Sequence, residues 1–169
     1  KWPGYGLPDS GSFQYVEHEF MKGEDYDAFL RDPSDWTIRH YLPRAFKELE
    51  GLQQLPPLSL FAFGHYFLPS LPFVATPPIQ AAVQALGKAV VEAQKDTANV
   101  GESTVRMLAL GFPPPPLAGA IAEAPFDFMS DTLRGMRGIM LDIHRRPEKL
   151  LAAMEKVLKY ELEHAIAFS

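Results

Sequence analysis

The sequence predicts a mostly helical chain with two or three short strands. Apolar residues recur every three or four positions in several long stretches, which is typical of amphipathic helices. Strict alternation of apolar and polar residues is confined to one short segment. Hydrophobic residues make up 47% of the 169 positions, which is enough for a packed core. The length fits one domain or a large part of one.

Composition excludes several classes of protein. The net charge of −5 argues against a nucleic-acid binder, and the absence of cysteine rules out disulfides and cysteine-bound zinc within this sequence. The sequence contains no run of eighteen apolar residues, so we expect no membrane-spanning helix. The first residues, KWPGYGLPDSGSF, lack an initiator Met and the layout of a signal peptide. We therefore expect a cytoplasmic segment of a longer protein, with neither nucleic acid nor membrane as partner.

The first third predicts one strand and two helices. Alternation in Phe13–Met21 predicts a strand, and Gly23–Arg31 a short helix with acidic residues in its first turn. Ser34 is a candidate N-cap for a helix over Trp36–Glu50. Pro43 predicts a kink or a restart within that helix.

The middle of the chain predicts apolar helices. Leu58–Leu71 fits a core helix, an oligomer contact or a membrane-surface segment, and the lack of a basic face favours the first two. Pro78–Leu110 has the longest helical pattern, in which Gly101 is a candidate break. Gly111-Phe112 and the four prolines at 113–116 stop it. We interpret the proline run as a stiff connector rather than a ligand for a proline-binding module.

The last third predicts a short strand, a turn and a final helix. Leu117–Ala122 is small and apolar, consistent with a buried strand, and Ala124–Gly135 leads from it into a helix. Arg146-Pro147 starts the last helix, with proline in its first turn. Its predicted apolar stripe comprises Leu150, Leu151, Met154, Val157, Leu158, Leu162, Ala165 and Ile166.

Common catalytic signatures are missing from the sequence. It has no glycine-rich nucleotide loop, no GxSxG and no HExxH, and its five histidines are not spaced for a local zinc site. Glu17 and Glu19 would share one strand face, about 7 Å apart. That spacing suits acid–base work or a metal, although a solvated strand face explains it more simply.

Two acids, a serine and an arginine stand among apolar residues in Ala124–Gly135. If a strand ends before this segment, its polar side chains lie just beyond the carboxyl end of that strand, where β/α barrels bind ligands. Asp131 and Arg134 are then the candidate catalytic residues. The candidate substrate-binding residues are Phe126, Asp127, Met129, Ser130, Glu17 and Glu19. A capped helix start with Arg134 paired to Asp131 or Ser130 explains the pattern equally well.

Two stretches resemble the uroporphyrinogen decarboxylase superfamily. They read APFDFMSDTLRGMRGIMLDIHRRPEKLLAAMEKV and LPDSGSFQYVEHEFMKGEDYDAFLRDP, and the second is similar to a less characterised bacterial branch. The resemblance implies part of an eight-fold β/α barrel, with its N-terminal and C-terminal portions missing. It implies a tetrapyrrole or a corrinoid-linked methyl group as substrate. No cofactor is expected in this chain; the zinc site of the related methyltransferases would lie in the missing part.

The turn departs from the decarboxylases, and the column at Asp131 is the one that matters. Their turn has Trp and Tyr where this sequence has Phe126 and Asp131. A carboxylate at the tyrosine position would repel an acetate-bearing substrate unless it is protonated or paired. The resemblance therefore favours another substrate, such as a corrinoid methyl donor, and an inactive fragment.

A non-enzymatic alternative remains open. Apolar helices separated from a barrel must bury their faces elsewhere, because large apolar patches rarely stay exposed. The chain would then be a helical oligomerisation or interaction module, and we would expect a homo-oligomer that buries these faces.

Overall fold

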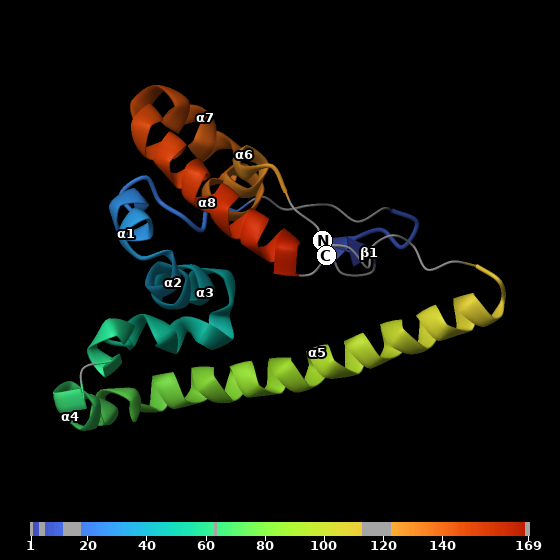
Figure 1. The fold of residues 1–169 in the computed structure, drawn as a ribbon, viewed down its shortest axis with the longest axis horizontal. Helices are drawn as coiled ribbons and strands as arrows, with labels where there is room; N and C mark the ends of the chain where they lie inside the picture. Colours follow the sequence, from blue (N-terminus) through green and yellow to red (C-terminus); the bar gives the residue numbers. More distant parts are fainter. Residues whose placement is uncertain (1, 4–5, 12–17, 63, 113–122, 168–169) are drawn as a thin grey trace.

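The computed structural model describes residues 2–3, 6–11, 18–62, 64–112 and 123–167. Helices dominate, and they form two regions (Figure 1). The first region joins the N-terminal helices to those of the C-terminal part. The second is a long helix, α5, that runs past the first region and extends well beyond the short segments at its start.

The two described strands are minimal. β1 (Trp2–Pro3) and β2 (Gly6–Leu7) pair in parallel, with Trp2 opposite Gly6. Of the predicted strand at Phe13–Met21, residues 13–17 lie outside the described part, and residues 18–21 are not a strand. The His18 and Phe20 rings nevertheless stack with their centroids 5.3 Å apart, as expected for neighbours on one face. The strand predicted at Leu117–Ala122 also lies outside the described part.

Short helical segments follow one another from residue 26 to residue 54. α1 (Tyr26–Arg31) ends at Asp32, and the Asp32 side chain caps α2 (Pro33–Trp36) by accepting from the Asp35 amide at 3.0 Å. The cap is thus Asp32 rather than Ser34, because Pro33 occupies the first helical position. The remaining segments are the π-helix η1 (Thr37–Tyr41), α3 (Leu42–Ala45) and the 3₁₀-helix η2 (Lys47–Gln54).

The helix changes from π to α geometry next to Pro43, where a kink or a restart was predicted, and its backbone stays helical through Tyr41 and Leu42. Pro43 lies in the first turn of α3, directly after the wide π-helical turn of η1. Proline lacks an amide hydrogen and crowds the preceding turn, and π-bulges and prolines are both common causes of helix kinks. The helix then breaks at Phe46, which is extended, so Trp36–Glu50 is not one helix.

The apolar segment after residue 57 does not form a core helix. It folds as η3 (Leu58–Ala62) and α4 (Gly64–Val74), which contains two prolines. Leu68 is 70% exposed, and Leu60, Phe67 and Leu71 are also exposed. The core interpretation is therefore wrong for these side chains, and a contact with another molecule stays a prediction.

α5 (Pro77–Ala109) is continuous over 33 residues. Gly101 does not break it, and the helix ends as predicted at Gly111, where a φ of 84° suits a residue without a side chain. Only its first turns are buried: Ile79 and Ala82 pack with Leu49, Leu52 and Leu55 of the η2 region in a small apolar core.

The C-terminal part packs against α1 and α2. It comprises α6 (Pro125–Asp127), the π-helix η5 (Phe128–Arg134), α7 (Gly135–Arg145) and α8 (Pro147–Ala167). α8 begins at Pro147 as predicted, but only Leu150 and Val157 of its predicted apolar stripe are buried, together with Ala153. These residues form the larger core with Met21, Tyr26, Phe29, Trp36, Met129, Leu133 and Ile139.

The helical content is thus confirmed, but the barrel is not shown. The described residues form no repeated strand–helix unit, and the two-residue strands lie at positions that the sequence pattern did not indicate. Among those residues, no helix is long and apolar enough to cross a bilayer.

Candidate functional site

The turn that carries the predicted site residues divides them between two environments. In η5, Met129, Ser130 and Arg134 are buried, whereas Asp131 is exposed. In α6, Asp127 is exposed and Phe126 is half-buried. Ser130 Oγ lies 3.0 Å from both the Asp127 carbonyl oxygen and Asp131 Oδ1, so its hydroxyl donates within the turn. The structure therefore separates Asp131 from Arg134.

Arg134 is the centre of a buried ion-pair network. Its Nε lies 2.6 Å from Asp142 Oδ2, and its Nη1 donates to the Met21 carbonyl oxygen at 2.6 Å and pairs with Glu19. Arg134 is 4% exposed and Asp142 is 0% exposed. Two predicted site residues, Glu19 and Arg134, thus meet although 115 positions separate them in the sequence.

Asp142 holds this network together and was not among the predicted residues. It also accepts from the Tyr26 hydroxyl at 3.0 Å and from Arg146 Nη1 at 2.9 Å. Burial opposes its charged form, but the hydrogen bonds from Arg134 and Tyr26 outweigh burial and lower the pKa of Asp142. A sequence signal existed, because Asp142 falls one helical turn from the buried Ile139.

A polar hollow lies beside this network. Its volume is about 290 Å³, and Glu19, Glu24 and Asp142 line it together with four arginines, Arg134, Arg137, Arg145 and Arg146. Arg134 and Arg146 are committed to carboxylates of the chain. Arg145 is exposed on the last turn of α7. The hollow therefore offers the exposed Arg145 guanidinium to a negatively charged ligand.

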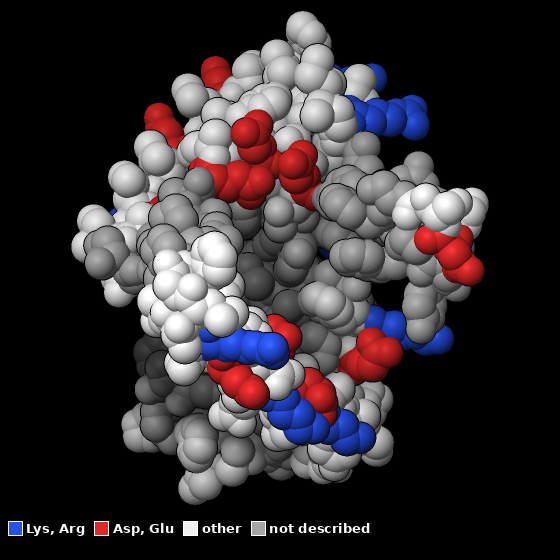
Figure 2. Space-filling model, turned by 90° about the vertical axis from the view of Figure 1, so that its right-hand side faces the viewer, with Lys and Arg blue, Asp and Glu red and all other residues white. Residues whose placement is uncertain are grey.

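The exposed acids of the turn belong to an acidic patch. Burial and the nearby charges of Asp131, Asp127 and Glu161 raise the pKa of Glu123. The Glu123 amide also donates to Glu161 Oε2 at 3.2 Å. Figure 2 shows Asp and Glu side chains gathered in one group at the height at which α6 lies in Figure 1. The negative charge of this patch attracts cations locally.

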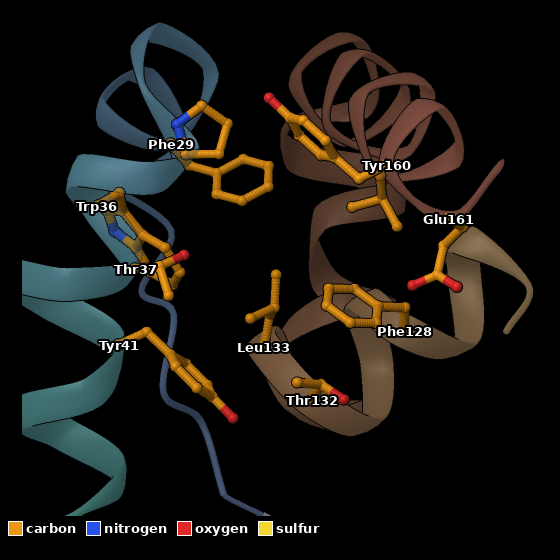
Figure 3. Close-up of a pocket in the computed structure, with 11 residues that line it drawn as sticks. Phe29, Trp36, Thr37, Tyr41, Phe128, Thr132, Leu133, Tyr160 and Glu161 are labelled. Atoms are coloured by element: carbon orange, nitrogen blue, oxygen red, sulfur yellow. The ribbon is translucent and has the colours of Figure 1, made fainter. Parts of the chain in front are cut away.

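An aromatic cavity lies between the N-terminal helices and the C-terminal part (Figure 3). It has a volume of about 160 Å³, and its walls include the rings of Phe29, Trp36, Tyr41, Phe128 and Tyr160. Trp36 Nε1 is buried and has no acceptor among the described residues. Sequence reasoning missed this cavity, because α1, α2, η1, η5 and α8 each supply only one to three of its side chains.

Metal binding finds no support in the described residues. No group of three or more His, Asp or Glu side chains among them is placed to hold a metal ion. Glu17, one of the two strand glutamates, lies outside the described part, so the proposed pairing of Glu17 with Glu19 stays a prediction. Comparison of the chain with protein-family models, curated proteins and solved structures finds no match.

Proposed function

We propose that this chain is part of a cytoplasmic enzyme similar to uroporphyrinogen decarboxylase, acting on a tetrapyrrole or on a corrinoid-linked methyl group. The sequence resemblance supplies the family. The observation that carries the proposal is the arginine-lined hollow beside α7, which contains two of the predicted site residues, Glu19 and Arg134. Tetrapyrroles carry carboxylates around their rim, and guanidinium groups bind carboxylates in a fixed, bidentate geometry.

The geometry changes the roles within that proposal. The Arg134 guanidinium donates to Asp142, to Glu19 and to the Met21 carbonyl oxygen, so Arg134 positions the wall of the hollow. Arg145, which is exposed at the same hollow, is the residue that meets the ligand. Asp131 faces solvent near Asp127 and serves the reacting side of the substrate in the complete enzyme.

The size of the hollow limits what this chain does alone. A volume of about 290 Å³ accommodates one edge of a tetrapyrrole, because ligand pockets for whole drug-sized molecules run from about 300 to 1,000 Å³. The rest of the substrate would bind to other parts of the enzyme. No described group of residues fits zinc, so we assign no step here to a metal.

Ligand titration tests the proposal. Uroporphyrin and hydroxocobalamin are titrated against the chain and followed by absorbance. Binding that Arg145→Gln weakens about tenfold supports the arginine hollow. The matched control is Arg106→Gln, which removes an exposed arginine on α5 and should bind like the wild type. Absence of binding by both ligands, or equal loss in both variants, would refute the proposal.

A second candidate function is self-association through α5. Its exposed apolar residues include Val83 (54%), Leu86 (36%), Val90 (56%), Val100 (58%) and Leu108 (53%). At 100° per residue they fall on the side of the helix that begins with the buried Ile79, whereas Lys88, Asn99 and Arg106 fall on the opposite side. The packed face of α5 thus continues for about seven turns beyond its buried contact with η2, from Ala82 to Leu108.

Molar mass in solution separates the two candidates. A dimer that Val90→Asp dissociates, and that binds neither tetrapyrrole nor corrinoid, favours the association module. The matched control is Asn99→Asp, which adds the same charge on the opposite side of α5. A monomer that binds one of the two ligands favours the enzyme.

A further inference from the structure

We propose that the aromatic cavity between the N-terminal helices and α8 binds a small methylated ammonium ion, such as choline. This inference goes beyond the proposed function and does not depend on it. It rests on three observations: the aromatic composition of the cavity wall, the sign of its charge, and its size.

The wall has the composition of a cation-binding cage. Five aromatic side chains contribute to it, namely Phe29, Trp36, Tyr41, Phe128 and Tyr160. In Figure 3, side chains of α1, α2 and η1 stand on one side of the cavity, and those of η5 and α8 stand on the other. Aromatic faces carry partial negative charge and attract cations, and cages of this kind recognise quaternary ammonium groups.

The charge of the wall has the matching sign. Among the described lining residues, Glu161 is the charged one, and no Lys, Arg or His occurs. Glu161 is held in place because its Oε2 accepts from the Glu123 amide. The adjacent acidic patch of Asp127, Asp131 and Glu123 adds to the negative potential. A neutral apolar ligand would gain nothing from these carboxylates, whereas a cation is favoured by each of them.

The volume selects a small ion. A cavity of about 160 Å³ is close to the engineered cavity of about 150 Å³ that accepts benzene. Tetramethylammonium and choline, with about five to seven heavy atoms, are of that size. A second hollow of about 360 Å³ adjoins the cavity, since both are lined by Pro33, Thr37 and Tyr160. A tetrapyrrole is excluded from this site by its size.

Fluorescence titration tests the inference. The chain has two tryptophans, so Trp2→Phe leaves Trp36, in the cavity wall, as the reporter. We expect choline and tetramethylammonium chloride to change its emission with saturation, against sodium chloride at equal ionic strength. The neutral isostere 3,3-dimethylbutan-1-ol should bind at least about tenfold more weakly, since it keeps the shape and loses the charge. Phosphocholine, which is bulkier and anionic, should also bind more weakly, which separates a free ion from a lipid headgroup.

Variants on α8 complete the test. Glu161→Gln should weaken choline binding about tenfold, whereas Glu163→Gln, the same change at an exposed position two residues on, should not. Tyr160→Phe should retain binding and Tyr160→Leu should lose it, because the ring is what the cation contacts. Circular dichroism confirms that each variant is folded. Equal binding of choline and its neutral isostere, or no saturable response to either ammonium ion, would overturn the inference.

Discussion

Removing Arg134 is expected to destabilise the fold far more than removing a surface charge. Arg134→Met keeps most of the side-chain volume but leaves the carboxylate of Asp142 buried without its nearest cation. Asp142 then keeps only the Tyr26 hydroxyl at 3.0 Å and Arg146 at 2.9 Å, and the Arg146 side chain is 37% exposed.

The size of the expected loss in unfolding free energy follows from the burial and spacing of these charges. Charges about 4 Å apart attract by about 4 kcal/mol at an effective dielectric constant of about 20. Breaking a buried pair by removing one partner typically costs about 3–5 kcal/mol. Because Tyr26 and Arg146 remain, we expect the free energy of unfolding to fall by about 3 kcal/mol, a large part of the 5–15 kcal/mol typical of a domain.

Urea unfolding followed by circular dichroism measures this loss. The control is Lys95→Met, which breaks an exposed pair with Glu92 whose side chains are 64% and 69% exposed, and which should cost less than about 1 kcal/mol. The double variant Arg134→Met/Asp142→Leu should be more stable than Arg134→Met alone, because no unpaired charge stays buried. If Arg134→Met cost no more than Lys95→Met, the network would contribute nothing to stability and the reasoning would fail.

Three further predictions follow from other contacts. The lowered pKa of Asp142 stabilises the fold above the unfolded pKa of about 3.9, and this stability is lost as the pH falls further. Urea unfolding at each pH should therefore show a flatter loss of stability for Asp142→Asn than for the wild type between about pH 4 and 2. Gly51→Ala should lower the melting temperature markedly, since a Cβ there would lie 2.0 Å from the Pro78 carbonyl oxygen. At Gly87 no atom lies within 4 Å of such a Cβ, so Gly87→Ala should stabilise α5 by up to about 1 kcal/mol. Burial and the neighbouring Asp142 raise the pKa of Tyr26. An absorbance titration up to about pH 12 should therefore count one ionising tyrosine fewer than the sequence contains, and Tyr26→Phe should give the same count as the wild type.

Local signals predicted the helices well. Pro147 at the start of α8 and Gly111 at the end of α5 act within one turn of the chain, and the structure follows both. Gly101 shows the limit of such signals, because a single glycine costs only about 1 kcal/mol and the surrounding helical residues outweigh it. Trp36–Glu50 was predicted as one helix with a kink or a restart at Pro43, because its periodicity is continuous. The structure instead divides it at the extended Phe46.

The candidate site was less predictable for a physical reason. Ser130 and Asp131 interact within one turn, and the sequence placed them together. The partners of Arg134 come from residues 19–21 and from α7, and no periodicity links those positions. The aromatic cavity depends in the same way on tertiary contacts between segments about 100 positions apart. Resemblance pointed to the turn, but only the structure distinguishes the buried, hydrogen-bonded Arg134 from the exposed Asp131.

The Arg134 network also has a consequence for folding, because its contacts join distant parts of the sequence. It joins the segment around Glu19 and Tyr26 to Arg134 and Asp142, across sequence separations of 113 to 116 residues. Closing so long a loop costs entropy before any contact repays it, and high contact order slows folding. During synthesis, the N-terminal segment must wait until α7 has left the ribosome, whereas α5 and η2 are neighbours in sequence and can pair earlier. We therefore expect the larger core around Tyr26 and Met129 to form after α5 and η2 have paired.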